Sequence, residues 1–149
     1  MSMNMKDTES NFKAYVFAVT EQVEQHISGL DQLAEILLTR PLSFNEKSAV
    51  ERSLQVIVEA AIGCSKHYLK LKQKPIPSDA RGTIERTYEL LGIQEPELYE
   101  MRGAIGMRNA IIHDYLNLDW KRLEKVLRER KYRRVLDYVK LVLKKMMEN

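Results

Sequence analysis

Apolar side chains recur every three or four residues along most of this chain, the spacing of helices that bury one face. No stretch of four or more residues alternates convincingly between apolar and polar positions, as a half-buried strand would. The helical pattern is interrupted at Pro41, Pro75, Pro77 and Pro96. Because proline breaks helix interiors but is tolerated in loops and first turns, these positions are predicted boundaries between helices.

Local capping signals refine these boundaries. Ser43 with Glu46 forms a capping box, Gly92 is a natural C-terminal stop, and Asp119 is a good N-cap. The predicted helices, in chain order and with approximate bounds, are 10–39, 43–72, 78–91, one that begins near 95 with Pro96 in its first turn, 120–128 and 132–147. We expect an all-α, mostly up-and-down bundle of about five helices in a single domain over 1–149, with 1–9 a flexible N-terminus.

Composition narrows the class of protein. The chain has 149 residues, of which 44% are hydrophobic, enough for one domain with a real core. No apolar run approaches the roughly 20 residues of a membrane helix, and the N-terminus lacks the features of a signal peptide. Cys64 is the only cysteine, so no internal disulfide can form. We therefore predict a cytoplasmic protein without a membrane partner.

Charge is distributed unevenly along the chain. Residues 121–145 carry eleven Lys or Arg side chains and three acidic ones, which gives +8, whereas the rest of the chain carries −5. This basic segment suggests an anionic partner, either RNA or an acidic protein, with Lys121, Arg122, Arg128 and Arg130 as candidate contacts. The alternative interpretation is an ordinary solvated helix face.

The stretch RNAIIHDY, residues 108–115, holds the side chains best suited to chemistry. The chain contains no glycine-rich phosphate loop and no GxSxG elbow. His26, His67 and His113 fall on three different predicted helices without a second His or Cys at ligand spacing, so neither a metal site nor a cofactor is predicted. His26 and His67 are expected on helix faces, and Cys64 in the core.

Arg108 and His113 are sufficient side-chain types for RNA cleavage without a metal. A base accepts the proton of the ribose 2′-OH as it attacks phosphorus, and a cation stabilises the developing charge, while Asn109 could orient a phosphate or a hydroxyl. However, two side chains that are five positions apart on a regular helix, as Arg108 and His113 are, point about 140° away from each other. The pair can meet only if the helix ends or distorts near His113, or if a second chain supplies half the site.

A strip of small residues on the same helix, Gly103, Gly106 and Ala110, would let another helix approach closely. A symmetric dimer is therefore one way to bring two copies of the motif together. The alternative interpretation is that Arg108 is a surface cation and His113 a satisfied residue at a helix end.

The pattern Arg108-NAII-His113-Asp-Tyr115 resembles the signature of HEPN-domain proteins, and within them the HepT-type toxins. AVERSLQVIVEAAIGCSKHYL (49–69), TYELLGI (87–93) and EMRGAIGMRNAIIHDYLNLDWKRLEKVL (100–127) are similar to the family's second helix, third helix and motif region. The resemblance covers about two thirds of the chain in the same order.

The resemblance implies a five-helix HEPN-like bundle that forms a homodimer with both motifs at the interface. It implies a metal-independent endoribonuclease, the toxin of a type II or VII-like toxin–antitoxin pair, in which Arg108, Asn109 and His113 are catalytic. The implied partner is an MNT-type nucleotidyltransferase antitoxin that can transfer AMP to Tyr115. The alternative function is a non-catalytic helical subunit that binds a minimal nucleotidyltransferase or a nucleotide. A third possibility is a purely structural helical dimer with neither activity.

Overall fold

The computed structural model describes residues 5–148, apart from the side chains of residues 5–10 and of Tyr115. Within these residues the chain is all-α, as predicted, and contains no strand. The elements are α1 (Met5–Leu37), α2 (Phe44–Leu71), α3 (Ala80–Leu91), α4 (Leu98–His113), the short 3-10 helix η1 (Tyr115–Asn117), α5 (Trp120–Arg128) and α6 (Arg133–Met147).

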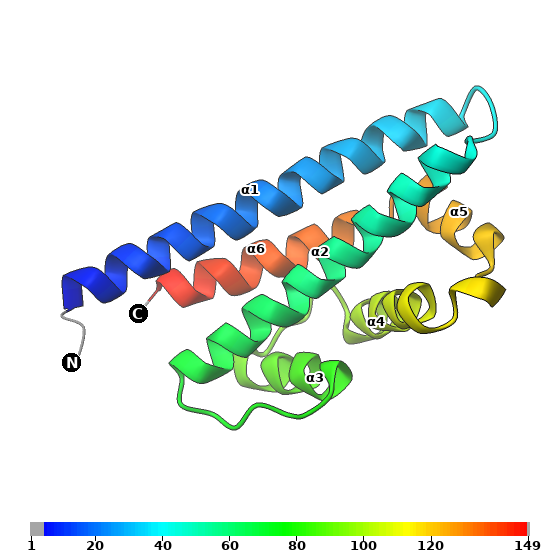
Figure 1. Ribbon diagram of the computed structural model, residues 1–149. Coiled ribbons are helices and arrows are strands. Elements are labelled where there is room, and N and C mark those ends of the chain that lie inside the picture. The colour runs from blue at the N-terminus through cyan, green and yellow to red at the C-terminus, as the bar shows by residue number, and fades with distance from the viewer. Residues whose placement is uncertain (1–4, 149) are drawn as a thin grey trace.

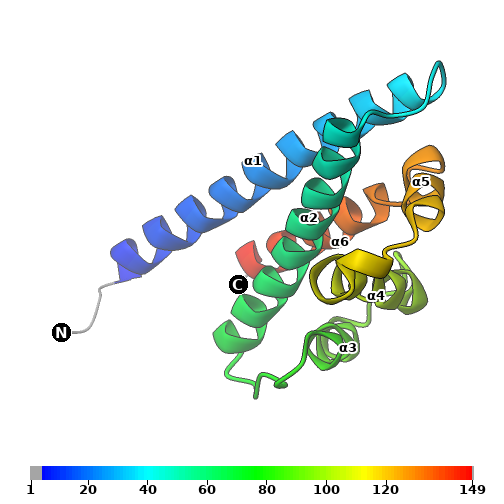
Figure 2. The same ribbon diagram turned by 45° about the vertical axis from the view of Figure 1, so that its right-hand side comes forward.

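Two long helices and α6 form the main body of the bundle. Figure 1 shows α1 and α2 running in opposite directions from a tight connection, with α6 packed along both. The shorter α3 and α4 lie against α2 on the side away from α1, and Figure 2 shows α5 beyond the end of α4. Residues 100–113 are thus held on a short helix at the side of the bundle rather than inside it.

Several predicted helix ends are confirmed by their caps. The Ser43 side chain accepts from the Glu46 backbone N–H while Glu46 Oε1 accepts from the Ser43 N–H at 2.8 Å, which completes the capping box. Gly92 ends α3 at φ 62°, a left-handed conformation that glycine adopts without steric cost. Asp119 accepts from the Lys121 N–H at 3.0 Å and begins α5 at the expected residue.

Other boundaries differ from the prediction. Helix α1 begins at Met5 rather than near Ser10; of the residues predicted to be flexible, 1–4 lie outside the described residues. Helix α4 begins at Leu98, so Pro96 precedes the helix instead of lying in its first turn. Glu97, whose backbone is extended at φ −67° and ψ 148°, is the N-cap of α4, and the Pro96 carbonyl before it accepts a hydrogen bond from the buried Tyr88 hydroxyl at 2.7 Å.

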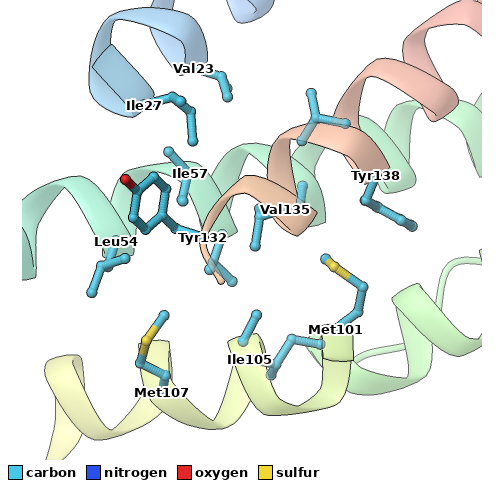
Figure 3. Packing of buried hydrophobic residues seen from close by; sticks show 14 of the residues in the cluster. Val23, Ile27, Leu54, Ile57, Met101, Ile105, Met107, Tyr132, Val135 and Tyr138 are labelled. Atoms are coloured by element: carbon cyan, nitrogen blue, oxygen red, sulfur yellow. The ribbon is translucent and has the colours of Figure 1, made fainter. Parts of the chain in front are cut away.

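The core fixes the orientation of α4. Met101, Ile105 and Met107 are almost fully buried, and Figure 3 shows them pointing from α4 toward Leu54 of α2 and Val135 of α6. With one side of α4 committed to the core, its opposite side must face outward. The outward side carries both glycines and the end of the motif.

Candidate functional site

The motif occupies the last turns of α4, and its side chains do not share one environment. Arg108 is half-buried, whereas Asn109 and His113 are exposed. Arg108 Nη1 donates to Asn109 Oδ1 at 2.6 Å, so the amide holds the guanidinium at the edge of the helix. Arg108 Nε is buried and has no hydrogen-bond partner among the described residues.

Helix α4 remains regular through His113 and then stops. The Asp114 N–H bonds to the Ala110 carbonyl at 3.0 Å, and the Asn117 side chain donates to Asp114 Oδ1 at 3.1 Å, which turns the chain into η1. No distortion precedes His113, so the separation of about 140° from Arg108 persists. Within the part of the chain that the structure describes, no hydrogen bond joins these two side chains.

Tyr115 begins η1, directly after the end of α4. Its side chain, the predicted acceptor of AMP, lies outside the described residues. The small residues of α4 are placed as expected: Gly103 and Gly106 are exposed, and a Cβ added to Gly103 would meet nothing within 4 Å. The outward side of α4 is therefore open to a close neighbour.

Most of the basic C-terminal segment is engaged within the chain. Asp31 of α1 accepts from Arg130 Nη1 at 3.1 Å and from Arg133 Nε at 3.2 Å. Arg134 pairs with Glu95 and, at 3.1 Å, with Glu100. The charge asymmetry along the sequence is thus partly neutralised in space, because basic residues of α6 and of the segment before it pair with acidic residues of α1, of α4 and of the connection before α4.

The four predicted contact residues fall into two groups. Arg128 pairs with Glu124 at 3.0 Å, and Arg130 pairs with Asp31 and Glu35. Lys121 and Arg122 are exposed on α5 and have no ion-pair partner among residues 5–148. Of these four residues, only Lys121 and Arg122 present a positive charge that no acidic side chain compensates among residues 5–148.

A groove of about 420 Å³ lies between α4, α5 and the start of α6, and we call it the α4–α5 groove. Its lining includes Tyr99, Gly103 and Met107 from α4 and Arg122 and Lys125 from α5. Neither Arg108, Asn109 nor His113 lines it. The α4–α5 groove therefore lies beside the motif rather than at it.

Tyr99 and Lys125 are not among the residues predicted from the sequence. The signals were present: Tyr99 precedes Gly103 by four residues and Gly106 by seven, so all three share the outward side of α4. Lys125 follows Arg122 by three residues and shares its side of α5. Helix periodicity places each pair on one face, but only the tertiary structure brings the two faces to the same groove.

His26, His67 and Cys64 lie away from the motif and contact neighbouring side chains or the core. His26 Nδ1 bonds to Ser53 Oγ at 2.9 Å, and the exposed His67 lies with its ring centroid 4.2 Å from that of Tyr15. Cys64 is fully buried, as predicted. Among the described residues, no group of three or more His, Cys, Asp or Glu side chains is arranged to hold a metal ion.

Comparison with known proteins identifies the family. The model of the HepT-like ribonuclease family matches residues 18–142, which include α4 and the whole motif. The chain belongs to this family. Among curated proteins, none matches the sequence. In the described part of this HepT-like chain, no helix is both long and apolar enough to cross a membrane.

Solved structures agree with this assignment at the level of the fold. A toxin–antitoxin complex crystallised with AMP-PNP has a chain with a TM-score of 0.72 and 18% identity, covering 85% of this chain and 96% of that one. A tri-AMPylated Shewanella oneidensis HEPN toxin in complex with MNT antitoxin has the same TM-score and coverage at 20% identity. At these identities the likeness establishes the fold alone, and it confirms the predicted HEPN-like bundle.

Proposed function

We propose that this HepT-like chain is the endoribonuclease toxin of a toxin–antitoxin pair and that it cleaves RNA with Arg108, Asn109 and His113. The observation that carries the proposal is the family match, which extends through the motif at the exposed end of α4. The two similar structures support the toxin role, because one contains a toxin–antitoxin complex and the other a HEPN toxin with its MNT antitoxin.

Each motif residue has a role that fits its environment. His113 is exposed at the end of α4, where its imidazole can accept the proton of a ribose 2′-OH. The 2′ oxygen then bonds to the adjacent phosphorus and the bond from phosphorus to the 5′ oxygen breaks. The products are a 2′,3′-cyclic phosphate and a 5′ oxygen that takes up a proton to become a hydroxyl. Arg108 stabilises the charge on the phosphate oxygens, and Asn109 orients its guanidinium.

A homodimer completes this site. Arg108 and His113 of one chain point about 140° apart, so one copy's guanidinium and the other's imidazole must converge on the phosphate. The buried and unpartnered Nε of Arg108 favours a side-chain rearrangement on assembly, since an unsatisfied buried donor costs about 1–3 kcal/mol.

The decisive experiment is cleavage of single-stranded RNA by the purified chain in the presence of EDTA. His113→Ala and Arg108→Gln should reduce the cleavage rate by about 100-fold or more, the usual contribution of an acid–base group. His67→Ala is the matched control, because His67 is also exposed but lies against the Tyr15 ring of α1, away from the motif. Light scattering should give the dimer mass for all three variants. Equal cleavage by wild type and His113→Ala would refute the assignment.

The second candidate is a non-catalytic subunit that binds a nucleotidyltransferase, and the AMPylated neighbour is the observation that favours it. In both functions an MNT-type antitoxin transfers AMP to Tyr115, forming a bond from the tyrosine oxygen to the α-phosphorus of ATP and releasing pyrophosphate. Intact RNA with wild-type chain, together with AMP on Tyr115 by mass spectrometry and none on Tyr115→Phe, would establish the second candidate. RNA cleavage that the modification suppresses would establish the first.

A further inference from the structure

The α4–α5 groove has the composition of a ligand site rather than of a packing defect. Its floor is apolar, formed by Met107 and Val135, and Figure 3 shows both on the core side of their helices. Its rim holds Tyr99, a residue that is 67% exposed, and the cations Arg122 and Lys125. A concave apolar surface with a few polar groups at its edge is the usual form of a small-ligand site.

The charge at this rim is not balanced by the chain itself. Glu100 also lines the groove, but its carboxylate is bonded to Arg134 at 3.1 Å. Lys131 pairs with Glu129 at 3.2 Å. Arg122 and Lys125 have no acidic partner in the part of the chain that the structure describes, so the rim is left with two positive charges. These two positive charges favour an anionic ligand in the groove.

The rim is continuous with the motif. A Cβ on Gly106 would lie 3.9 Å from Arg122 Nη2, so the Arg122 guanidinium stands beside the outward side of α4. His113 follows Gly106 by seven residues, which is almost two full turns, and lies on the same side about 10 Å along the axis. A single-stranded RNA could therefore run along α4 from His113 to Arg122 and into the groove.

We propose that the α4–α5 groove is a subsite for one unpaired nucleotide of the RNA substrate, with its base on Tyr99 and the apolar floor and its phosphate on Arg122 and Lys125. The proposal rests on the ribonuclease function proposed above. Single-stranded RNA is commonly bound by stacking a splayed base on an aromatic ring while cations follow the backbone. The groove supplies both elements, and its volume is in the range of small-ligand pockets.

The test measures binding of a short, unstructured, fluorescein-labelled RNA to the full chain carrying His113→Ala, so that the probe stays intact. Adding Arg122→Gln should weaken binding about tenfold and lower the slope of log affinity against log salt by about 0.7, the loss of one phosphate contact. Adding Tyr99→Ala should weaken binding about tenfold without changing the slope, because stacking carries no charge.

Lys144→Gln is the matched control, because Lys144 is an exposed cation near the C-terminal end of α6. Figure 1 shows that this end of α6 is the one away from α5. It should change neither affinity nor slope, and light scattering and melting curves should show the same dimer mass and fold for every variant. An equal loss with Lys144→Gln would reduce the effect to general charge and overturn the subsite.

The subsite and the proposed function fail in different ways. If wild type cleaves RNA but Arg122→Gln and Tyr99→Ala leave affinity and slope unchanged, the subsite is wrong and the ribonuclease stands. If these variants instead lose a co-expressed nucleotidyltransferase while binding RNA normally, the groove belongs to a protein partner and the subsite is again wrong. If wild type neither binds nor cleaves RNA, both proposals fall.

Discussion

The Tyr132 hydroxyl, at the N-cap of α6, donates a hydrogen bond to Asp31 Oδ1 of α1 at 2.5 Å, across 101 positions of sequence. The tyrosine ring is almost fully buried beneath this contact. Arg130 and Arg133 donate to the same carboxylate, so Asp31 joins α1 to the segment between α5 and α6. That segment forms one wall of the α4–α5 groove. The position of this wall therefore depends on α1, a helix that does not itself line the groove.

Removing the tyrosine hydroxyl should weaken this connection. Tyr132→Phe is expected to lower the free energy of unfolding by about 1–2 kcal/mol, since it removes one hydrogen bond to a charged acceptor and leaves the ring packing intact. Urea unfolding followed by circular dichroism would measure the change. Tyr99→Phe is the control, because the Tyr99 side chain is largely exposed and its hydroxyl can bond to water in either state. Equal stability of wild type and Tyr132→Phe would show that the contact adds nothing.

The Asp31 carboxylate should also make the free energy of unfolding depend on pH in the acid range. Burial opposes ionisation of Asp31, but hydrogen bonds from Arg133 and Tyr132 outweigh it and hold the pKa of Asp31 below its usual 3.8. A carboxyl with a lowered folded-state pKa stabilises the protein above the unfolded-state pKa, and this stabilisation is lost as pH falls through the folded value. The free energy of unfolding should therefore drop below about pH 4.

Asp31→Asn should reduce stability near neutral pH and flatten this pH dependence in the acid range. Glu46 contributes separately, because the hydrogen bond from Arg40 and the capping contacts at Ser43 lower its pKa to about 2. Some acid sensitivity should thus remain in Asp31→Asn. Parallel pH profiles for the variant and wild type would contradict the assignment to Asp31.

Two glycines should respond oppositely to the same substitution. Gly103→Ala is expected to stabilise the fold by about 0.5–1 kcal/mol, because the position is in the interior of α4 and the added Cβ meets nothing within 4 Å. Gly92→Ala should destabilise it by about 1 kcal/mol, since the residue has φ 62°. Melting temperatures of the two variants would decide, and destabilisation by Gly103→Ala would show that this surface of α4 is already covered in the free protein.

The capping box of α2 should be worth a measurable amount. Ser43→Ala removes the acceptor for the Glu46 N–H and is expected to cost about 1 kcal/mol. Ser48→Ala is the matched control, because Ser48 is exposed inside the same helix, where alanine is the better helix former. Chemical denaturation of both variants gives the comparison. A Ser43→Ala variant as stable as Ser48→Ala would place the start of α2 under tertiary rather than local control.

Cys64 should be unreactive in the folded protein. Burial raises the pKa of its thiol to about 12, so almost no thiolate is present at neutral pH, and the side chain is inaccessible. Iodoacetamide labelling followed by mass spectrometry should modify Cys64 only in denaturant. Rapid labelling under native conditions would instead reveal frequent local opening of α2 around this residue.

The sequence by itself determined the features that depend on neighbours within a few residues. Apolar spacing places the helices, and the caps at Ser43, Gly92 and Asp119 lie where the pattern predicted them, because a cap satisfies backbone groups only three or four residues away. The motif pattern likewise identified the family, and helix periodicity alone showed that Arg108 and His113 cannot share one face of a regular helix.

Tertiary packing decided the rest. The charge count along residues 121–145 suggested a free basic segment, but Arg130 and Arg133 find Asp31 about a hundred positions earlier, and Arg134 finds Glu95 and Glu100. The carbonyl of Pro96, just before α4, likewise accepts a hydrogen bond from the Tyr88 hydroxyl of α3, a contact that helix periodicity does not predict. Ion pairs and grooves depend on which helix faces meet in space, and periodicity within one helix carries no information about its neighbour.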